Sequence, residues 1–212
     1  MASRSDEEKP VRWQQRKSAA TREAILDAAV NCLVDGGYAG LTTIEITKRA
    51  AISRGAMHHH FANRAELLAA LIDYVLHRRM ERYLNHYRRS LPAEPSEQSV
   101  QVASDTHWQS VLTPEYTAFL ELTIAARTDP ALEKVLAPAT RDFDREWIEA
   151  MRQSFPQWEG RFETMVLASD FAAALHVGLL VNRPLPTGEA RHQAVKDLLV
   201  EVIQRLQAGD LP

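Results

Sequence analysis

The sequence predicts an all-α protein of about nine helices, and three observations support this fold class. Apolar residues recur at the spacing of one helix face; the first such stripe consists of Ile25, Ala28, Ala29, Cys32 and Leu33. No stretch alternates apolar and polar residues as a half-buried strand would. Proline and glycine lie between the stripes, where helices are expected to begin or end.

Capping signals divide the N-terminal part into a tail and four helices. Residues 1–11 are polar and charged, so we expect a disordered tail. Gly36 and Gly37 are expected to end the first helix, and Thr42 and Glu45 have the spacing of a capping box for the second. The predicted helices cover residues 12–36, 43–50, 54–60 and 64–89.

Proline and glycine also divide the rest of the chain. Residues 91–98 include Pro92 and Pro95 and are predicted to form a loop. Pro114 and Pro130 stand where the first turn of a helix tolerates proline. The predicted helices cover residues 98–111, 114–127, 130–154, 160–182 and 188–208.

Composition favours a globular protein of the cytoplasm. Hydrophobic residues make up 45% of the chain and charged residues 25%. There is no uninterrupted apolar run of about 18 residues and no apolar secretion signal, so we expect neither a membrane helix nor export. The single cysteine, Cys32, excludes an internal disulfide framework. It is expected to pack in the core, with redox sensing as the less favoured alternative.

Charge is distributed unevenly along the chain. Residues 1–64 hold ten Lys and Arg against seven Asp and Glu, whereas the remainder holds fifteen against twenty-one. A basic N-terminal part on an acidic body suits a protein that presents one end to a polyanion. A chance difference of this size is the alternative.

Residues 42–64 read TTIEITKRAAISRGAMHHHFANR and have the spacing of a helix-turn-helix. Ser53 is placed to cap the second of two short helices. The apolar residues that can face inward as a miniature core are Ile46, Ala50, Ile52 and Met57. Residues 43–62 are therefore predicted to form a support helix, a tight turn and a short helix able to enter a major groove about 12 Å wide.

These residues resemble the TetR family of transcriptional regulators (TetR/AcrR type). The resemblance extends over residues 18–72, about a quarter of the chain. It is carried by Gly37-Tyr38, Thr42-Thr43, Ile52-Ser53-Arg54-Gly55, His59-His60-Phe61, Arg64 and Leu67-Leu68. It implies a DNA-binding domain over residues 12–64 and an effector-binding and dimerisation domain over residues 65–212.

The resemblance also implies which residues meet DNA: Thr43, Arg54, Gly55, Ala56, His58, His59, His60 and Arg64. Arg54 leads the reading helix and would bond guanine through two hydrogen bonds. Thr43, His60 and Arg64 would contact phosphate, which fixes register and not sequence. Gly55 would let the backbone come near the DNA.

Three positions depart from the family pattern. Ala51 stands where the family usually has glycine in the turn, so it is strained if that position needs a positive φ. His58 replaces a common tyrosine, and Ala56 replaces a frequent threonine. These changes affect the target sequence and leave the motif in place.

An internal pocket for a small-molecule effector is a further implication of the resemblance. The candidate residues are Trp108, Tyr116, Phe119, Trp147, Asp170 and His176. Bulky apolar residues at helical spacing are ordinary core in most proteins, which is the alternative for the aromatic ones. A buried carboxylate needs a partner, so Asp170 either faces such a pocket or lies at a helix edge in water.

The last two predicted helices carry apolar stripes, and the family pairs such helices with their symmetry mates as a four-helix bundle. A homodimer of this kind would place two reading helices about 34–36 Å apart on a near-palindromic operator. The expected function is that of a repressor released from its double-stranded DNA operator by a small molecule. Repression follows from the habit of the family.

Two other functions are considered. A ligand-independent DNA-binding or architectural protein would share the motif. An enzyme is not expected, since the sequence has no nucleophile elbow, P-loop or dinucleotide fingerprint. No metal or cofactor is expected either, because His58, His59 and His60 point about 100° apart on a helix. The basic run of the fourth helix is expected to be a solvated face rather than a surface that attracts DNA; it consists of Arg78, Arg79, Arg82, Arg88 and Arg89.

Overall fold

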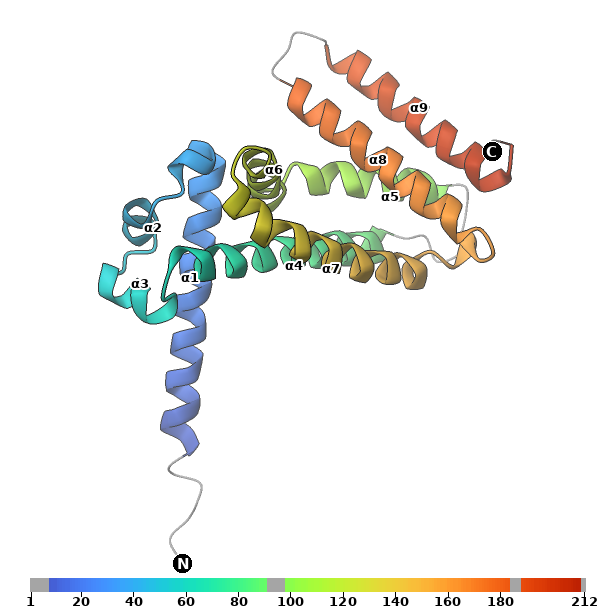
Figure 1. Cartoon of the computed structure of the whole chain (residues 1–212). Coiled ribbons are helices and arrows are strands. Elements are labelled where there is room, and N and C mark those ends of the chain that lie inside the picture. The colour runs from blue at the N-terminus through green and yellow to red at the C-terminus, as the bar shows by residue number, and fades with distance from the viewer. Residues whose placement is uncertain (1–7, 91–97, 184–187, 211–212) are drawn as a thin grey trace, which may run out of the picture. The chain divides into compact units, whose positions relative to one another are not determined.

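The computed structural model describes residues 8–90, 98–183 and 188–210, and these residues form helices joined by short links (Figure 1). The all-α prediction is confirmed, since the described residues contain nine α-helices, one 3-10 helix and no strand. The elements are α1 (Glu8–Gly40), α2 (Thr43–Arg49), α3 (Arg54–His60), α4 (Arg64–Ser90), α5 (Gln98–Val111), α6 (Pro114–Ala126), α7 (Pro130–Ser154), η1 (Pro156–Trp158), α8 (Phe162–Asn182) and α9 (Glu189–Ala208).

The first helix begins earlier than predicted, and one further turn follows its predicted end. It begins at Glu8, so residues 8–11 of the expected tail are helical, while residues 1–7 lie outside the described part. Its regular backbone is interrupted at Gly37, which has φ 61° and ψ −168°, and one more turn follows to Gly40. Gly37 therefore ends the regular helix where the sequence predicted. Of the predicted loop at residues 91–98, residues 91–97 also lie outside the described part, and Gln98 begins α5.

The helices group into two compact units that differ from the predicted division at residue 65. Unit 1 comprises residues 1–75 and 117–139, and unit 2 comprises residues 76–116 and 140–212. The helices α4, α6 and α7 each contribute to both units. The helix-turn-helix is therefore packed with part of the segment that was expected to belong to the effector domain.

Unit 1 has a core built on the predicted apolar stripe of α1. Its fully buried side chains include Ile25, Ala29 and Leu33 of α1 and Leu71 of α4. Cys32 is also buried, and its burial raises the pKa of the thiol, as expected of a residue that packs in the core. The second segment of the unit adds Leu122 and Leu132, which are fully buried as well.

Tyr38 connects the end of α1 to the start of α7 within unit 1. Its hydroxyl donates a hydrogen bond to Asp129 Oδ2 at 3.1 Å. Asp129 Oδ1 in turn accepts from the backbone N–H groups of Ala131 and Leu132, at 3.0 and 3.1 Å, and so caps α7. The N–H of Leu132 and the hydroxyl of Tyr38 hold the pKa of the Asp129 carboxyl below its usual value.

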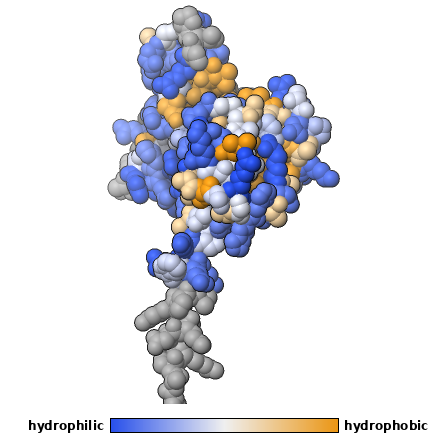
Figure 2. All heavy atoms as spheres, turned by 90° about the vertical axis from the view of Figure 1, so that its left-hand side faces the viewer, coloured by the Kyte–Doolittle hydropathy of each residue, from blue (hydrophilic) through white to orange (hydrophobic). Residues whose placement is uncertain are grey.

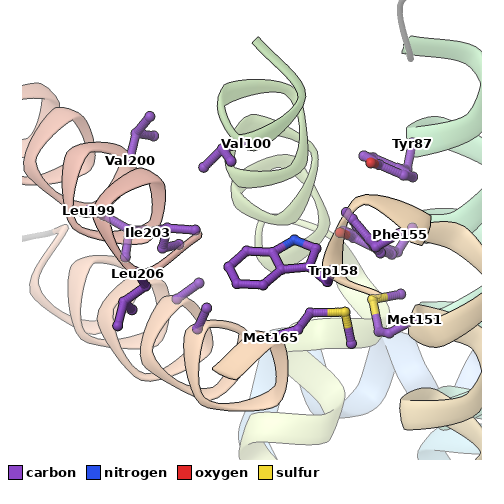
Figure 3. Close-up of a cluster of buried hydrophobic side chains, with 13 residues drawn as sticks. Tyr87, Val100, Met151, Phe155, Trp158, Met165, Leu199, Val200, Ile203 and Leu206 are labelled. Carbon is purple, nitrogen blue, oxygen red and sulfur yellow. The ribbon is translucent and has the colours of Figure 1, made fainter. Parts of the chain in front are cut away.

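Unit 2 has an aromatic core, shown in Figure 3. Trp158 of η1 lies in the middle of the view, with Ile203 and Leu206 of α9 on one side and Phe155, the residue between α7 and η1, on the other. Tyr87 of α4 is fully buried and stacks on the ring of Phe155 with 4.4 Å between ring centroids. The core thus joins α4, α7 and α9 around one tryptophan.

The helix α8 was not expected to resemble a membrane helix, but by length and composition alone it is apolar enough to span one. Large apolar side chains of α8 and α9 lie at the surface of the single chain, with exposed fractions from 41% to 58%: Leu167, Phe171, Val181 and Leu198. An orange patch toward the top of Figure 2 shows hydrophobic residues at the surface. Asp170 interrupts the apolar run of α8 without making the helix polar on average.

Candidate nucleic-acid interface and internal cavities

The two short helices of the motif begin at the side chains that the sequence predicted as caps. Thr42 Oγ1 accepts a hydrogen bond from the Glu45 N–H at 3.2 Å, and Ser53 Oγ accepts from the Ala56 N–H at 3.1 Å. Each bond satisfies an N–H group that has no partner inside its helix. The starts of α2 and α3 are therefore fixed by local contacts.

The turn between α2 and α3 has the positive φ that would strain Ala51. Ala51 has φ 53°, the one positive φ at a non-glycine residue in the described part of the chain. A side chain in this left-handed conformation costs about 1–2 kcal/mol. The turn keeps its shape through hydrogen bonds from the Ala51 N–H to Lys48 O and from the Ile52 N–H to Thr47 O, at 3.3 and 3.1 Å.

The helix α3 buries one side chain and presents the others. Met57 is 4% exposed, and Ile46 of α2 is fully buried beneath the motif, whereas Ala50 and Ile52 are half-buried. Of the four residues of the predicted miniature core, two are thus buried and two are half-buried. The exposed residues of α3 are Arg54, Gly55, His58 and His59, and the half-buried ones are Ala56 and His60. Figure 2 faces the side on which α2 and α3 lie in Figure 1, and hydrophilic residues dominate there.

Gly55 is not required by packing inside the chain. A Cβ atom added at this position would come no closer than 3.8 Å to a neighbour, Ser53 Oγ. Alanine is also the better helix former by about 1 kcal/mol. A glycine here makes physical sense if another molecule approaches the backbone of α3.

The support helix α2 is tied to α1 by charge. Arg49 bonds Asp35 Oδ2 of α1 through Nη1 at 2.5 Å and Glu45 Oε1 of its own helix through Nε at 2.9 Å. These two carboxylates raise the pKa of the Arg49 guanidinium above its ordinary value. Thr43, at the first position of α2, is exposed.

Arg64 has a structural contact that the sequence did not predict. Its Nη1 donates to Leu41 O at 2.9 Å, and its guanidinium lies over the ring of Tyr38 at 5.5 Å from the centroid. Arg64 therefore holds the link between α1 and α2, and any bond to phosphate would use its other N–H groups.

Two adjoining cavities lie in unit 2. The apolar cavity opens onto about 620 Å³ of empty space and the polar cavity onto about 490 Å³. The apolar cavity is lined by Tyr83, Ser99, Val100, Ala103, Ser104, His107, Trp147, Met151, Phe155, Trp158, Met165, Ala168, Ser169, Ala172 and Ile203. The polar cavity is lined by Arg79, His107, Ser110, Tyr116, Phe143, Trp147, Ser169, Asp170 and Ala173. They share His107, Trp147 and Ser169.

His107 forms a pair with His176 beside the cavities. Their Nδ1 atoms are 2.8 Å apart, so one imidazole donates and the other accepts. Burial lowers the pKa of both side chains, and the charges of Arg79 and Lys196 lower them further. Both histidines are therefore neutral at pH 7.

In the described residues no three His, Cys, Asp or Glu side chains gather as a metal site would require. His59 and His60 stack with 5.7 Å between ring centroids.

The amino-acid sequence is similar to those of known regulatory proteins. The model of the family described as "Bacterial regulatory proteins, tetR family" matches residues 25–71. A helix-turn-helix (HTH)-type transcriptional regulator of Mycobacterium tuberculosis is 29% identical over 190 residues, which cover 87% of this chain and 93% of that protein. The HTH-type transcriptional regulator CymR of Pseudomonas putida is 30% identical over 123 residues, 58% of this chain and 59% of that protein.

The chain belongs to the TetR family of HTH transcriptional regulators. Solved structures agree in fold. A TetR family transcription regulator from Marinobacter aquaeolei VT8 has a TM-score of 0.57 and 16% identity, and covers 91% of this chain and 97% of its own. The multidrug binding protein EbrR, complexed with imidazole, has a TM-score of 0.58 and 19% identity, and covers 87% and 93%. The family consists of transcriptional regulators and not of enzymes, in agreement with the sequence.

The effector residues predicted for this TetR-family chain are distributed unevenly. Trp147 lines both cavities, while Tyr116 and Asp170 line the polar one, Asp170 with an exposed side chain. His176 and Trp108 lie next to the lining, with 5.7 Å between their ring centroids. Phe119 belongs to unit 1 and lines neither cavity.

Arg79 and His107 were missed as cavity residues. The solvated-face prediction is right for Arg82, Arg88 and Arg89, which are exposed, and wrong for Arg79. Steps of four residues along α4 lead from Arg79 to Tyr83 and Tyr87, which are both buried. This periodicity could have placed Arg79 on the inward face.

The histidine pair predicts a pH dependence of stability. Because the folded-state pKa of His107 and His176 is lowered, the unfolded chain binds more protons once the pH falls below about 6.5. The free energy of unfolding in urea should therefore decrease between about pH 6.5 and pH 5, and this contribution should be absent above pH 7.

The change His176→Gln should flatten this pH dependence, whereas His86→Gln, at an exposed position of α4, should leave it unchanged. An equally steep decrease in His176→Gln would show that the pair is not its source.

Proposed function

We propose that the chain is a cytoplasmic, homodimeric repressor that reads a near-palindromic operator with α3 and is released by a small molecule bound in unit 2. The observation that carries the proposal is the outward face of α3. Arg54, Gly55, His58 and His59 are exposed while Met57 is buried. A short helix held in this way is suited to a major groove.

The roles of the exposed residues follow from their chemistry. Arg54 at the start of α3 has the planar fork that bonds guanine O6 and N7. Thr43 and the histidines of α3 have the donors that phosphate accepts. A phosphate contact positions the protein on DNA, whereas a base contact selects the sequence. Thr43 is therefore expected to affect binding to all sequences, and Arg54 to affect sequence preference.

The exposed apolar side chains of α8 and α9 support a dimer. Leu167, Phe171, Val181 and Leu198 would be costly to leave in water and are gathered on the last two helices. A second copy of the chain would bury them in an interface of the same residues. This also accounts for the membrane-like composition of α8 without a membrane.

The helix α4 supports a coupling between ligand and DNA. It begins at Arg64, four residues after α3 ends, and continues to Arg79 and Tyr83 in the cavity linings. A ligand that favours one position of α4 shifts the population of the DNA-binding form by its differential affinity.

A ligand-independent DNA-binding or architectural protein is the second candidate, since the same motif would serve it. The two functions differ in one observable, the release of DNA by a small molecule. The adjoining cavities favour the first candidate.

Replacing Arg54 tests the reading helix. Operator sites selected from a random DNA pool should be near-palindromic, and Arg54→Ala should lose about 1–3 kcal/mol of discrimination at one base pair of each half-site. Fluorescence anisotropy with the selected duplex and single-base variants measures this loss. Thr43→Ala should instead weaken binding to all sequences alike.

Arg127→Ala is the control, because Arg127 is exposed in unit 1 but lies outside the motif. Unchanged base preference in Arg54→Ala would remove Arg54 from the reading surface. A selected site without twofold symmetry would contradict the dimer.

Replacing an apolar residue of the last two helices tests the dimer. Leu198→Glu and Phe171→Glu should give monomers in sedimentation velocity at micromolar concentration and reduce operator affinity by more than about tenfold, since a monomer meets only one half-site. Ile124→Glu is the matched control, because Ile124 is equally exposed but lies on α6. If both variants remain dimeric, the interface lies elsewhere.

A further inference from the structure

The hydrogen bond between His107 and His176 makes the two rings opposite tautomers. Both imidazoles are neutral at pH 7 because burial lowers their pKa, so each ring carries one proton. The two Nδ1 atoms are 2.8 Å apart, and one of them donates to the other. The donating ring has no proton left for its Nε2, whereas the accepting ring carries its proton on Nε2.

The surroundings of His176 decide which ring donates. His176 of α8 is fully buried, and its Nε2 is enclosed without a hydrogen-bond partner among the described residues. Among backbone groups, a buried N–H without a partner is rarer than a carbonyl oxygen that lacks one. The same preference leaves Nε2 of His176 without a proton, so His176 donates through Nδ1.

His107 therefore carries its proton on Nε2. It belongs to α5 and lines the apolar cavity. In the described part of the chain, the enclosed side-chain nitrogens without a partner include Nε2 of His176 but not Nε2 of His107. Because Nδ1 of His107 is bonded to His176, the polar group that His107 can offer to a ligand is the Nε2–H, a hydrogen-bond donor.

The rest of the apolar cavity gives a ligand few other acceptors. Phe155, Met151 and Met165 contribute a ring and two thioethers, which accept hydrogen bonds only weakly. The other polar side chains of the lining are those of serine and tyrosine, which donate or accept, and those of tryptophan, which only donate. With His107 as a donor, this lining is richer in donors than in acceptors.

We propose that His107 is a specificity-determining residue of the apolar cavity, held as a donor by His176, and that the cavity takes a mainly apolar molecule whose polar atom is an acceptor such as a carbonyl oxygen. The term effector for this molecule rests on the proposed function, whereas the tautomers and the binding do not. A molecule with a donor in place of the acceptor would leave the Nε2–H of His107 unpaired, at a cost in affinity.

Nitrogen NMR of the imidazole rings tests the tautomers on the full-length chain without any ligand. Proton–nitrogen correlation spectra at pH 7, assigned residue by residue, distinguish a protonated ring nitrogen from a bare one. His107 should be protonated at Nε2, and His176 should be protonated at Nδ1. The reverse arrangement, or both rings protonated at Nε2, would overturn the proposal, and this readout requires no substitution.

Matched probes test the ligand class. 2-Acetonaphthone and 2-isopropenylnaphthalene have nearly the same shape, and a carbonyl oxygen in the first replaces a methylene group in the second. Isothermal titration calorimetry, with the protein titrated into each probe, gives the ratio of the two affinities. This ratio should favour the ketone about 2- to 10-fold more in the unaltered chain than in His107→Phe, as expected for one hydrogen bond between uncharged groups. Comparing ratios cancels the difference in hydrophobicity between the probes.

Two control variants locate the effect. His86→Phe makes the same change at an exposed position of α4 and should leave the ratio as it is. Ala103 lines the apolar cavity but not the polar one, so Ala103→Leu should weaken both probes by similar factors while the tautomers stay the same. Full affinity for both probes in Ala103→Leu would contradict the choice of cavity.

Two further results would refute the ligand class: a ketone preference that is unchanged in His107→Phe, and no binding of either probe at saturation. Operator binding is measured separately. A chain that binds its operator but has the reverse tautomers refutes this inference and leaves the regulator intact. A chain that shows the expected tautomers and ketone preference, but keeps its operator when the ketone binds, leaves the site intact and counts against release by such a ligand.

Discussion

The burial of Met57 and Phe61 is the contact on which the orientation of α3 depends. A helix of seven residues is too short to be stable alone, so its packing must hold it. Met57 is 4% exposed and Phe61 is 2% exposed, and the guanidinium of Arg22 from α1 lies over the Phe61 ring at 4.5 Å. Because one side of α3 is packed in this way, the side chains of Arg54, His58 and His59 on its other side are exposed.

In unit 1 a second set of contacts joins the end of α1 to the start of α4 and to the start of α7. Tyr38 receives the guanidinium of Arg64 on its ring and donates its hydroxyl to Asp129, the cap of α7. The link that precedes α2 is held by Arg64 through Leu41 O. The Gly-Tyr pair of the motif therefore has a packing reason, since Gly37 redirects the chain and Tyr38 then reaches another helix.

The sequence predicted most where the signals are local. Thr42, Ser53 and the prolines at positions 114 and 130 set helix starts through contacts with their own neighbours, and those starts agree with the structure to within about two residues. Contacts between segments far apart in the sequence could not be predicted. The pairing of His107 with His176 crosses 69 residues, and no local pattern in either helix indicates it.

Arg79 shows an intermediate case between local and distant signals. Its spacing from Tyr83 and Tyr87 was visible in the sequence, yet five arginines close together are usually a solvated face. The rings of Tyr116 and Phe143 that stack near it come from α6 and α7. The division into units was likewise hidden, because it depends on how α6 and α7 pack and not on their composition.

Cleavage of DNA from a tether on α3 tests the central claim most directly. Cys32, the single cysteine, is only 1% exposed, so a cysteine introduced by His59→Cys can be labelled selectively with iron–EDTA. Hydroxyl radicals from the label should cut the selected operator at two symmetry-related places about one helical turn apart, and high salt should abolish both. Cutting spread evenly along the duplex, or none at all while the protein is bound, would show that α3 does not lie in the groove.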